Sequence, residues 1–148
     1  MKRHLFWALG LFLLAGCDSQ GAKEDDIPAD AGRIVIGDYA LDGMQGDPFE
    51  LRAARIDGML LVLDVAYSGG CEEHEFTGFT PEVVLTIYPY QLSVLIAHDS
   101  HSDMCEAYIS ESVSLDLTPL VGAFGEIFQL TVLPVHSDSE SIILQRGQ

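Results

Sequence analysis

Apolar and polar residues alternate along most of the chain after residue 33, which is the pattern of a half-buried β-strand. The clearest stretch is residues 58–67, where Met59, Leu61, Leu63, Val65 and Tyr67 share one parity. Further strands are predicted at residues 34–36, 73–79, 83–88, 92–99, 107–117, 127–135 and 141–145. Turn signals separate these strands about every ten residues, which is typical of a β-sandwich or a barrel.

Helical periodicity is not sustained anywhere after residue 17, and at most a single helical turn is expected, at residues 118–124. We therefore predict an all-β fold, an antiparallel β-sandwich of immunoglobulin-like or related type. A β-barrel is the alternative.

One residue departs from the alternation. In residues 107–117 the apolar Ile109, Val113 and Leu115 point inward, and Glu111 lies on the same parity. We favour a β-bulge that resets the parity at this point. A carboxylate that is buried or lines a cleft is the other interpretation.

The first seventeen residues have the composition of an export signal. Lys2 and Arg3 precede a short apolar run over residues 5–15, which is too short to span a bilayer as a permanent helix. The run ends in Leu-Ala-Gly-Cys at residues 14–17. This ending resembles the lipobox of bacterial lipoprotein precursors.

The resemblance implies a signal peptide over residues 1–16 and a lipid anchor on Cys17, the first residue of the mature chain. Two or three acyl chains, palmitate among them, would hold the protein at a membrane facing the periplasm. Asp18 favours retention in the inner membrane, but the resemblance does not decide between the inner and the outer membrane.

Residues 18–32 contain five acids, a proline and two glycines, and Ile27 is their one aliphatic side chain larger than alanine. Such a segment cannot bury enough apolar surface to order itself. We predict that residues 17–32 are a lipidated cysteine with a flexible acidic tether, and that residues 33–148 form a single domain.

Charge limits the partners of the mature chain. Cleavage before Cys17 removes Lys2 and Arg3, which leaves five basic residues against 23 acidic ones and a net charge of −18. Such a surface repels nucleic acid. The partners that remain are the membrane, through the lipid, and a cationic ligand such as a metal ion, a basic peptide or a basic protein.

Cys71 and Cys105 remain once Cys17 is acylated. Two cysteines in an oxidising compartment are expected to form a disulfide, which would close a loop of 34 residues.

Each of these cysteines has a histidine nearby, in residues 68–74 and 98–105. His74 and His98 share parity with apolar neighbours in their strands, so we expect both rings to point inward beside the disulfide. Our first interpretation is a disulfide flanked by two hydrogen-bonded histidines. The alternatives are a metal ion held by the histidines with Asp99, Asp103 or Glu73, and a zinc site that uses both thiolates.

The pattern Gly-Gly-Cys-x-x-His, followed by His-Asp and Asp-x-Cys, is similar to that of uncharacterised envelope lipoproteins, and it implies only that the two segments act together. The sequence contains no hydrolase elbow and no phosphate-binding loop, so we expect no enzyme and no catalytic residue. We predict an envelope lipoprotein that binds or scaffolds, without a cofactor. A metal-handling lipoprotein using His74 and His98 is the alternative.

Overall fold

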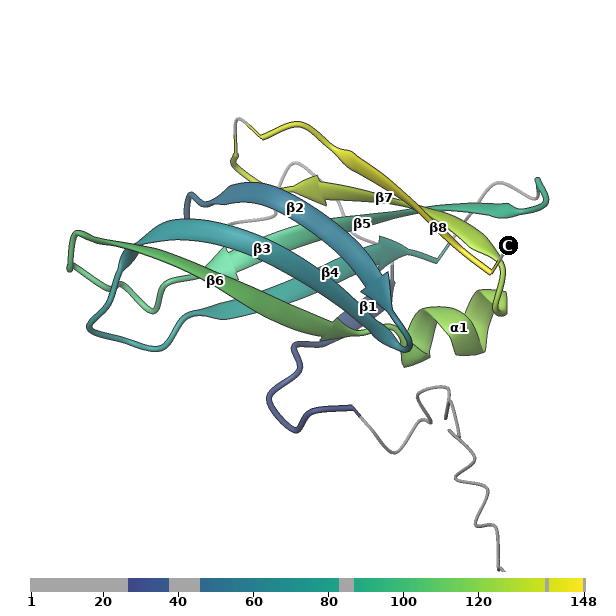
Figure 1. The fold of residues 1–148 in the computed structure, drawn as a ribbon, viewed down its shortest axis with the longest axis horizontal. Helices are drawn as coiled ribbons and strands as arrows, with labels where there is room; N and C mark the ends of the chain where they lie inside the picture. The colour runs from purple at the N-terminus through teal and green to yellow at the C-terminus, as the bar shows by residue number, and fades with distance from the viewer. Residues whose placement is uncertain (1–26, 38–45, 83–86, 138, 148) are drawn as a thin grey trace, which may run out of the picture.

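The computed structural model describes residues 27–37, 46–82, 87–137 and 139–147 of the 148-residue chain. In these residues, the strands form two facing sheets, and one short helix accompanies them (Figure 1). The elements are β1 (Ile34–Gly37), β2 (Glu50–Asp57), β3 (Leu60–Gly69), β4 (Glu75–Pro81), β5 (Tyr90–Asp99), β6 (Ala107–Asp116), α1 (Thr118–Phe124), β7 (Phe128–Pro134) and β8 (Ile142–Arg146).

One sheet has the strand order β2-β3-β6 and the other β1-β4-β5-β7-β8. The prediction of an all-β sandwich is confirmed, and the sheets do not close into a barrel. The five-stranded sheet is mixed, however, because β1 pairs with β4 and β5 pairs with β7 in parallel. The strands that separate these partners in the sequence, β2 and β3 in one case and β6 in the other, belong to the opposite sheet. Those long connections allow a parallel return.

The core lies between the sheets and is built from the inward parity of the predicted strands. Leu61, Leu63 and Val65 of β3 face Val94 and Ile96 of β5 across the interior, and all five are almost fully buried. Burial of this apolar surface is the main favourable term in folding. A helix is present at residues 118–124, as α1, and its seven residues make about two turns where a single turn was predicted.

The predicted strands differ from the structure in two places. β2 is not among them, because a β-bulge between Leu51 and Ala53 breaks its alternation. Ile87 and Tyr88, from the strand predicted at residues 83–88, lie outside any strand. Residues 83–86 fall outside the described ranges.

The bulge predicted at Glu111 is also wrong. The register between β3 and β6 is unbroken over both strands, and Glu111 lies opposite Val65. The side chain of Glu111 therefore stays on the inner face of its sheet. It is tolerated there because it lines a solvent-open cleft and hydrogen-bonds a tyrosine, as described below.

Gly32 joins the two sheets just before β1. Its N–H donates to the carbonyl of Ser114 at 2.8 Å, and its own carbonyl accepts from the N–H of Asp116 at 2.9 Å. The next carbonyl, that of Arg33, accepts from Gly78 of β4 in the other sheet. A Cβ at Gly32 would lie 2.4 Å from a Leu115 methyl, so only glycine fits this close approach.

The contacts of Gly32 place the end of the predicted tether against β6, so ordered chain begins before residue 33. The predicted signal peptide, Cys17 and Asp18 lie outside the described residues. Within the described ranges, no helix has both the length and the apolar composition needed to cross a membrane.

Candidate functional site

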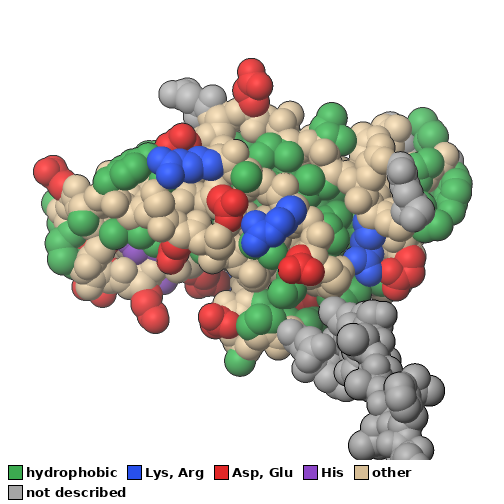
Figure 2. Space-filling model, viewed as in Figure 1, with side chains coloured by type: hydrophobic (Ala, Val, Ile, Leu, Met, Phe, Trp, Pro, Cys, Tyr) green, Lys and Arg blue, Asp and Glu red, His purple; other side chains and the backbone are tan. Residues whose placement is uncertain are grey.

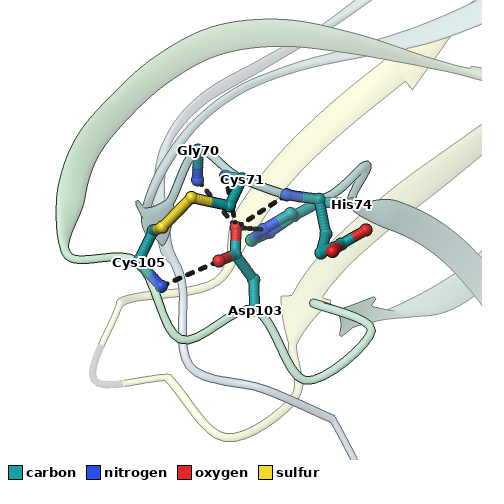
Figure 3. The surroundings of a disulfide bond; sticks show 6 residues. Gly70, Cys71, His74, Asp103 and Cys105 are labelled. Atoms are coloured by element: carbon teal, nitrogen blue, oxygen red, sulfur yellow. Dashed lines mark hydrogen bonds and ion pairs between the residues drawn. A yellow bond between two sulfur atoms is a disulfide. The ribbon is translucent and has the colours of Figure 1, made fainter.

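Cys71 and Cys105 form the predicted disulfide at one end of the sandwich (Figure 3). Cys71 lies in the loop between β3 and β4, and Cys105 lies in the loop between β5 and β6. Their Cα atoms are 5.9 Å apart, within the usual range for a disulfide. The bond therefore ties the two loops that carry the candidate histidines.

Asp103 fastens the same two loops a second time (Figure 3). Its Oδ2 accepts the backbone N–H groups of Gly70, Cys71 and Glu72 at 2.8, 2.9 and 3.1 Å, and its Oδ1 accepts that of Cys105 at 2.8 Å. The side chain is completely buried. These bonds, led by the one from Cys105, hold the pKa of Asp103 well below its usual range, so the carboxylate is ionised.

His74 and His98 meet beside this carboxylate, as predicted. His74 Nδ1 lies 2.8 Å from His98 Nε2, and His74 Nε2 lies 3.2 Å from Asp103 Oδ2. On the far side, His98 Nδ1 donates to the carbonyl of Asp47 at 3.3 Å. The four groups form one chain of hydrogen bonds, of which Asp47 was not foreseen from the sequence.

The chain of hydrogen bonds fixes how many protons the two rings need. Each of its three contacts requires one N–H, and two neutral imidazoles supply only two. All three bonds are made when the pair carries a third proton, and the ionised Asp103 then neutralises that charge. Burial, followed by the electrostatic effect of His74, lowers the pKa of His98.

Aromatic rings enclose the histidine pair. Tyr67 stacks on His74 with ring centroids 4.4 Å apart, and Phe76 stacks on His98 at 4.6 Å. Gly69 leaves the space that the His74 ring occupies, since a Cβ there would lie 2.5 Å from it. The pair is thus a packed part of the core.

Asp47 is itself held by Ser100, from the loop after β5. Its Oδ2 accepts both the backbone N–H of Ser100 at 2.8 Å and the hydroxyl at 2.5 Å. These two bonds lower the pKa of Asp47. They also position the backbone carbonyl that His98 uses.

Two of the predicted metal ligands, Asp99 and Glu73, bond His101 and do not contact the histidine pair. Asp99 is exposed and accepts the N–H of His101, and the Glu73 carbonyl accepts from the His101 ring at 2.7 Å. Ligand atoms of Cys71, Asp103 and Cys105 lie within 4.8 Å of one another, but both sulfurs belong to the disulfide. The thiolate zinc site is therefore wrong for the oxidised protein. The four ring nitrogens of His74 and His98 bond each other, Asp103 and the carbonyl of Asp47.

Tyr67 connects the histidine pair to Glu111. Its hydroxyl donates to Glu111 Oε1 at 2.5 Å, while its ring covers His74. Burial, together with this carboxylate, raises the pKa of Tyr67, so the phenol keeps its proton. Glu111 is thus the cleft carboxylate of the second interpretation.

A cleft of about 800 Å³ opens at this point between β6 and the start of β4. Five of its lining residues are acidic: Asp30, Glu72, Glu73, Glu75 and Glu111. The lining contains no lysine or arginine among the residues that the structure describes. Figure 2 shows acidic side chains along the lower edge of this face of the molecule, near a small area of histidine surface.

No protein-family model matches the chain, and no curated protein does. Solved structures with a similar fold include a protein of unknown function, DUF1344, from Bacteroides vulgatus, with TM-score 0.52, 12% identity and coverage of 80% of this chain and 56% of that one. A NigD-like immunity protein from Bacteroides caccae gives TM-score 0.52, 16% identity and coverage of 76% and 58%. A putative toxin-related protein from Parabacteroides distasonis gives TM-score 0.50, 13% identity and coverage of 77% and 61%. The chain spans less than two thirds of the length of each, and the likeness shows the fold alone.

Proposed function

We propose that the protein is a lipid-anchored binding module of the bacterial envelope, and that its ligand is a cationic segment of another protein held in the cleft beside β6. The observation that carries this proposal is the acidic lining of the cleft, where Glu73, Glu75 and Glu111 face a space of about 800 Å³. A cleft lined by one sign of charge concentrates ligands of the opposite sign.

The buried histidine pair supports a binding module more than an enzyme. Each polar group of the pair already has a partner within the fold, since the ring nitrogens bond each other, Asp103 and the carbonyl of Asp47. A catalytic acid or base needs a proton that a substrate can reach. The pair instead fixes the loops that form one wall of the cleft.

The envelope location comes from the N-terminal sequence. The Leu-Ala-Gly-Cys ending at residues 14–17 supports a lipid on Cys17, and the acidic segment after it supports a tether. As a coil, the nine residues from 18 to 26 would reach about 15–18 Å, which would lift the domain above the lipid headgroups. The cleft would then face proteins in the periplasm.

The test is titration of the full-length protein, oxidised and in a non-ionic detergent, with an octapeptide of alternating lysine and threonine. We expect binding that weakens with salt. Glu73→Gln and Glu111→Gln should each weaken it several-fold. Asp57→Asn, which makes the same charge change on an exposed residue outside the cleft, should leave the affinity within about twofold.

Equal weakening by all three substitutions would show that the peptide binds the acidic surface at large, and the proposal would fail. Binding of a glutamate and threonine octapeptide with the same affinity would also contradict it.

A further inference from the structure

β6 is an edge strand of the three-stranded sheet, and part of its backbone faces away from β3. The carbonyl of Ser114 and the N–H of Asp116 bond Gly32, so the backbone groups of these two residues point outward. Backbone direction alternates along an unbroken antiparallel strand, and the same therefore holds for Ser110 and Ser112.

The described chain covers only the C-terminal end of this edge. Gly32 pairs with Leu115 as an isolated bridge, and the N–H of Ala31 bonds the carbonyl of Pro28 in a turn. The exposed stretch from Ser110 to Ser112 precedes that bridge on β6. An open edge of this kind is a template for pairing with another chain.

The acidic cleft borders this edge. Ser112 and Ser114 of β6 line one side of it, and Glu72 and Glu73 line the other side. An extended chain placed in the cleft would therefore have the backbone of β6 within reach and carboxylates around it.

We propose that the cleft takes an extended, lysine- or arginine-containing segment of a partner protein as an additional strand on β6. This inference rests on the proposed function and adds the manner of binding. The outward N–H and carbonyl groups of Ser110 and Ser112 pair with the backbone of the segment, which gives affinity without regard to sequence. A residue opposite Glu111 points to the same face of the sheet as Glu111, into the cleft. Because side chains alternate along a strand, every second residue of the segment carries the positive charge.

Charge argues against two other occupants of the β6 edge, namely the N-terminal part of this chain and a second copy of the protein. Residues 18–26 of this chain, with Asp18, Glu24, Asp25 and Asp26 against the single Lys23, would be repelled by the acidic lining. A second copy paired through β6 would bring two copies of Glu111 and two strongly acidic chains together. Both arrangements place like charges side by side, which is unfavourable.

The experiment compares the lysine and threonine octapeptide with a version methylated on every backbone amide nitrogen, which keeps the charge but cannot donate hydrogen bonds to the outward carbonyls of β6. The protein variants are Ser112→Pro and Ser112→Ala. Proline removes the outward N–H without breaking a bond to β3, and alanine keeps it. Thermal unfolding of both variants checks that they fold.

We expect the methylated peptide to bind at least tenfold more weakly, and Ser112→Pro to bind the unmodified peptide at least tenfold more weakly than Ser112→Ala. If Ser112→Pro does not fold, the comparison of the methylated with the unmodified peptide on wild-type protein tests strand addition by itself. Equal affinities for both peptides, together with weakening by Glu111→Gln, would overturn strand addition while leaving the acidic cleft as a binding site. Absence of binding to either peptide would overturn the proposed function as well. If sedimentation shows a dimer that the peptide does not dissociate, the β6 edge pairs with a second copy of the protein, and the proposal fails.

Discussion

His74 Nδ1 lies 2.8 Å from His98 Nε2, and this contact joins the two loops that the disulfide also ties. The bond is part of a continuous path from the ionised Asp103 to the backbone carbonyl of Asp47. The Asp103 side chain at one end of the path is completely buried, and His98, next to the other end, stacks on Phe76 in the core. The histidine pair therefore couples the wall of the cleft to the interior of the sandwich.

The lowered pKa of His98 predicts how stability changes with pH. The folded protein keeps His98 neutral below pH 6.5, where the unfolded chain binds a proton there, so this residue makes the protein less stable as pH falls. We expect the unfolding free energy of wild type, relative to His98→Gln, to fall as the pH drops below 6.5, by at most about 1.4 kcal/mol per pH unit. Urea unfolding at several pH values measures it.

The subtraction removes the effect of charged groups that do not contact His98, and the difference therefore reports the histidine pair. Below about pH 4 the wild type should lose further stability, because Asp103 has a lowered pKa and its folded form resists protonation. A difference between wild type and His98→Gln that stays constant from pH 7.5 to 4.5 would contradict the neutral, buried His98.

Removal of the disulfide should destabilise the domain without unfolding it. We expect the Cys71→Ala and Cys105→Ala double variant to lose about 2–5 kcal/mol of unfolding free energy, since the bond closes a loop of 34 residues. The four backbone bonds to Asp103 should still hold the loops together. Urea unfolding of the oxidised wild type and the variant gives the difference, and a loss below 1 kcal/mol would show that Asp103 alone suffices.

Gly32 and Gly122 form a matched pair of positions for testing the bridge between the sheets. A Cβ at Gly32 would lie 2.4 Å from Leu115 Cδ2 and 2.5 Å from the carbonyl oxygen of Phe76, whereas one at Gly122 would meet nothing within 4 Å. Gly32→Ala should cost about 1–3 kcal/mol through overpacking. Gly122→Ala, in α1, should be neutral or stabilising by up to about 1 kcal/mol. Chemical unfolding of both variants tests the contrast, which would be lost if Gly32 lay in open space.

The sequence was sufficient for the parts of the fold with regular alternation. β3 and β6 pair without interruption, so the inward positions of Leu63 and Leu115 could be predicted from parity alone. The inward positions of β2 could not be predicted in this way, because the bulge between Leu51 and Ala53 shifts its inward residues by one position. The parallel pairs depend on how the chain crosses between sheets, and local patterning carries no signal for that.

The same limit applies to the candidate site. Parity placed His74 and His98 inside, and the cysteine count placed the disulfide beside them. Asp47 precedes β2 by three residues and reaches His98 only through the fold, so its part in the site could not be read from spacing. Asp103 looked like a metal ligand because acidic residues near histidines are typical of metal sites, but its oxygens are taken by backbone N–H groups.

The lipid anchor remains a prediction from the first seventeen residues. Cys17→Ser should abolish incorporation of labelled palmitate and leave the precursor uncleaved, because the thiol is the atom that would be acylated. Cys71→Ser is the matched control, since it removes a different thiol and should still be labelled. Metabolic labelling followed by electrophoresis tests both. Unchanged labelling of Cys17→Ser would overturn the anchor.

The histidine pair also predicts the response to zinc. Binding one ion with both rings would require the bond between His74 Nδ1 and His98 Nε2 to break and Asp103 to exchange backbone partners, since ligand nitrogens must direct their lone pairs at the metal. We therefore expect isothermal titration of zinc into the oxidised protein to give the same weak binding for wild type, His74→Ala and His98→Ala. That residual affinity would belong to exposed carboxylates, and Glu73→Gln with Glu75→Gln should reduce it. Zinc binding at one site per chain that both histidine variants weaken at least tenfold would instead show that the pair opens to hold metal.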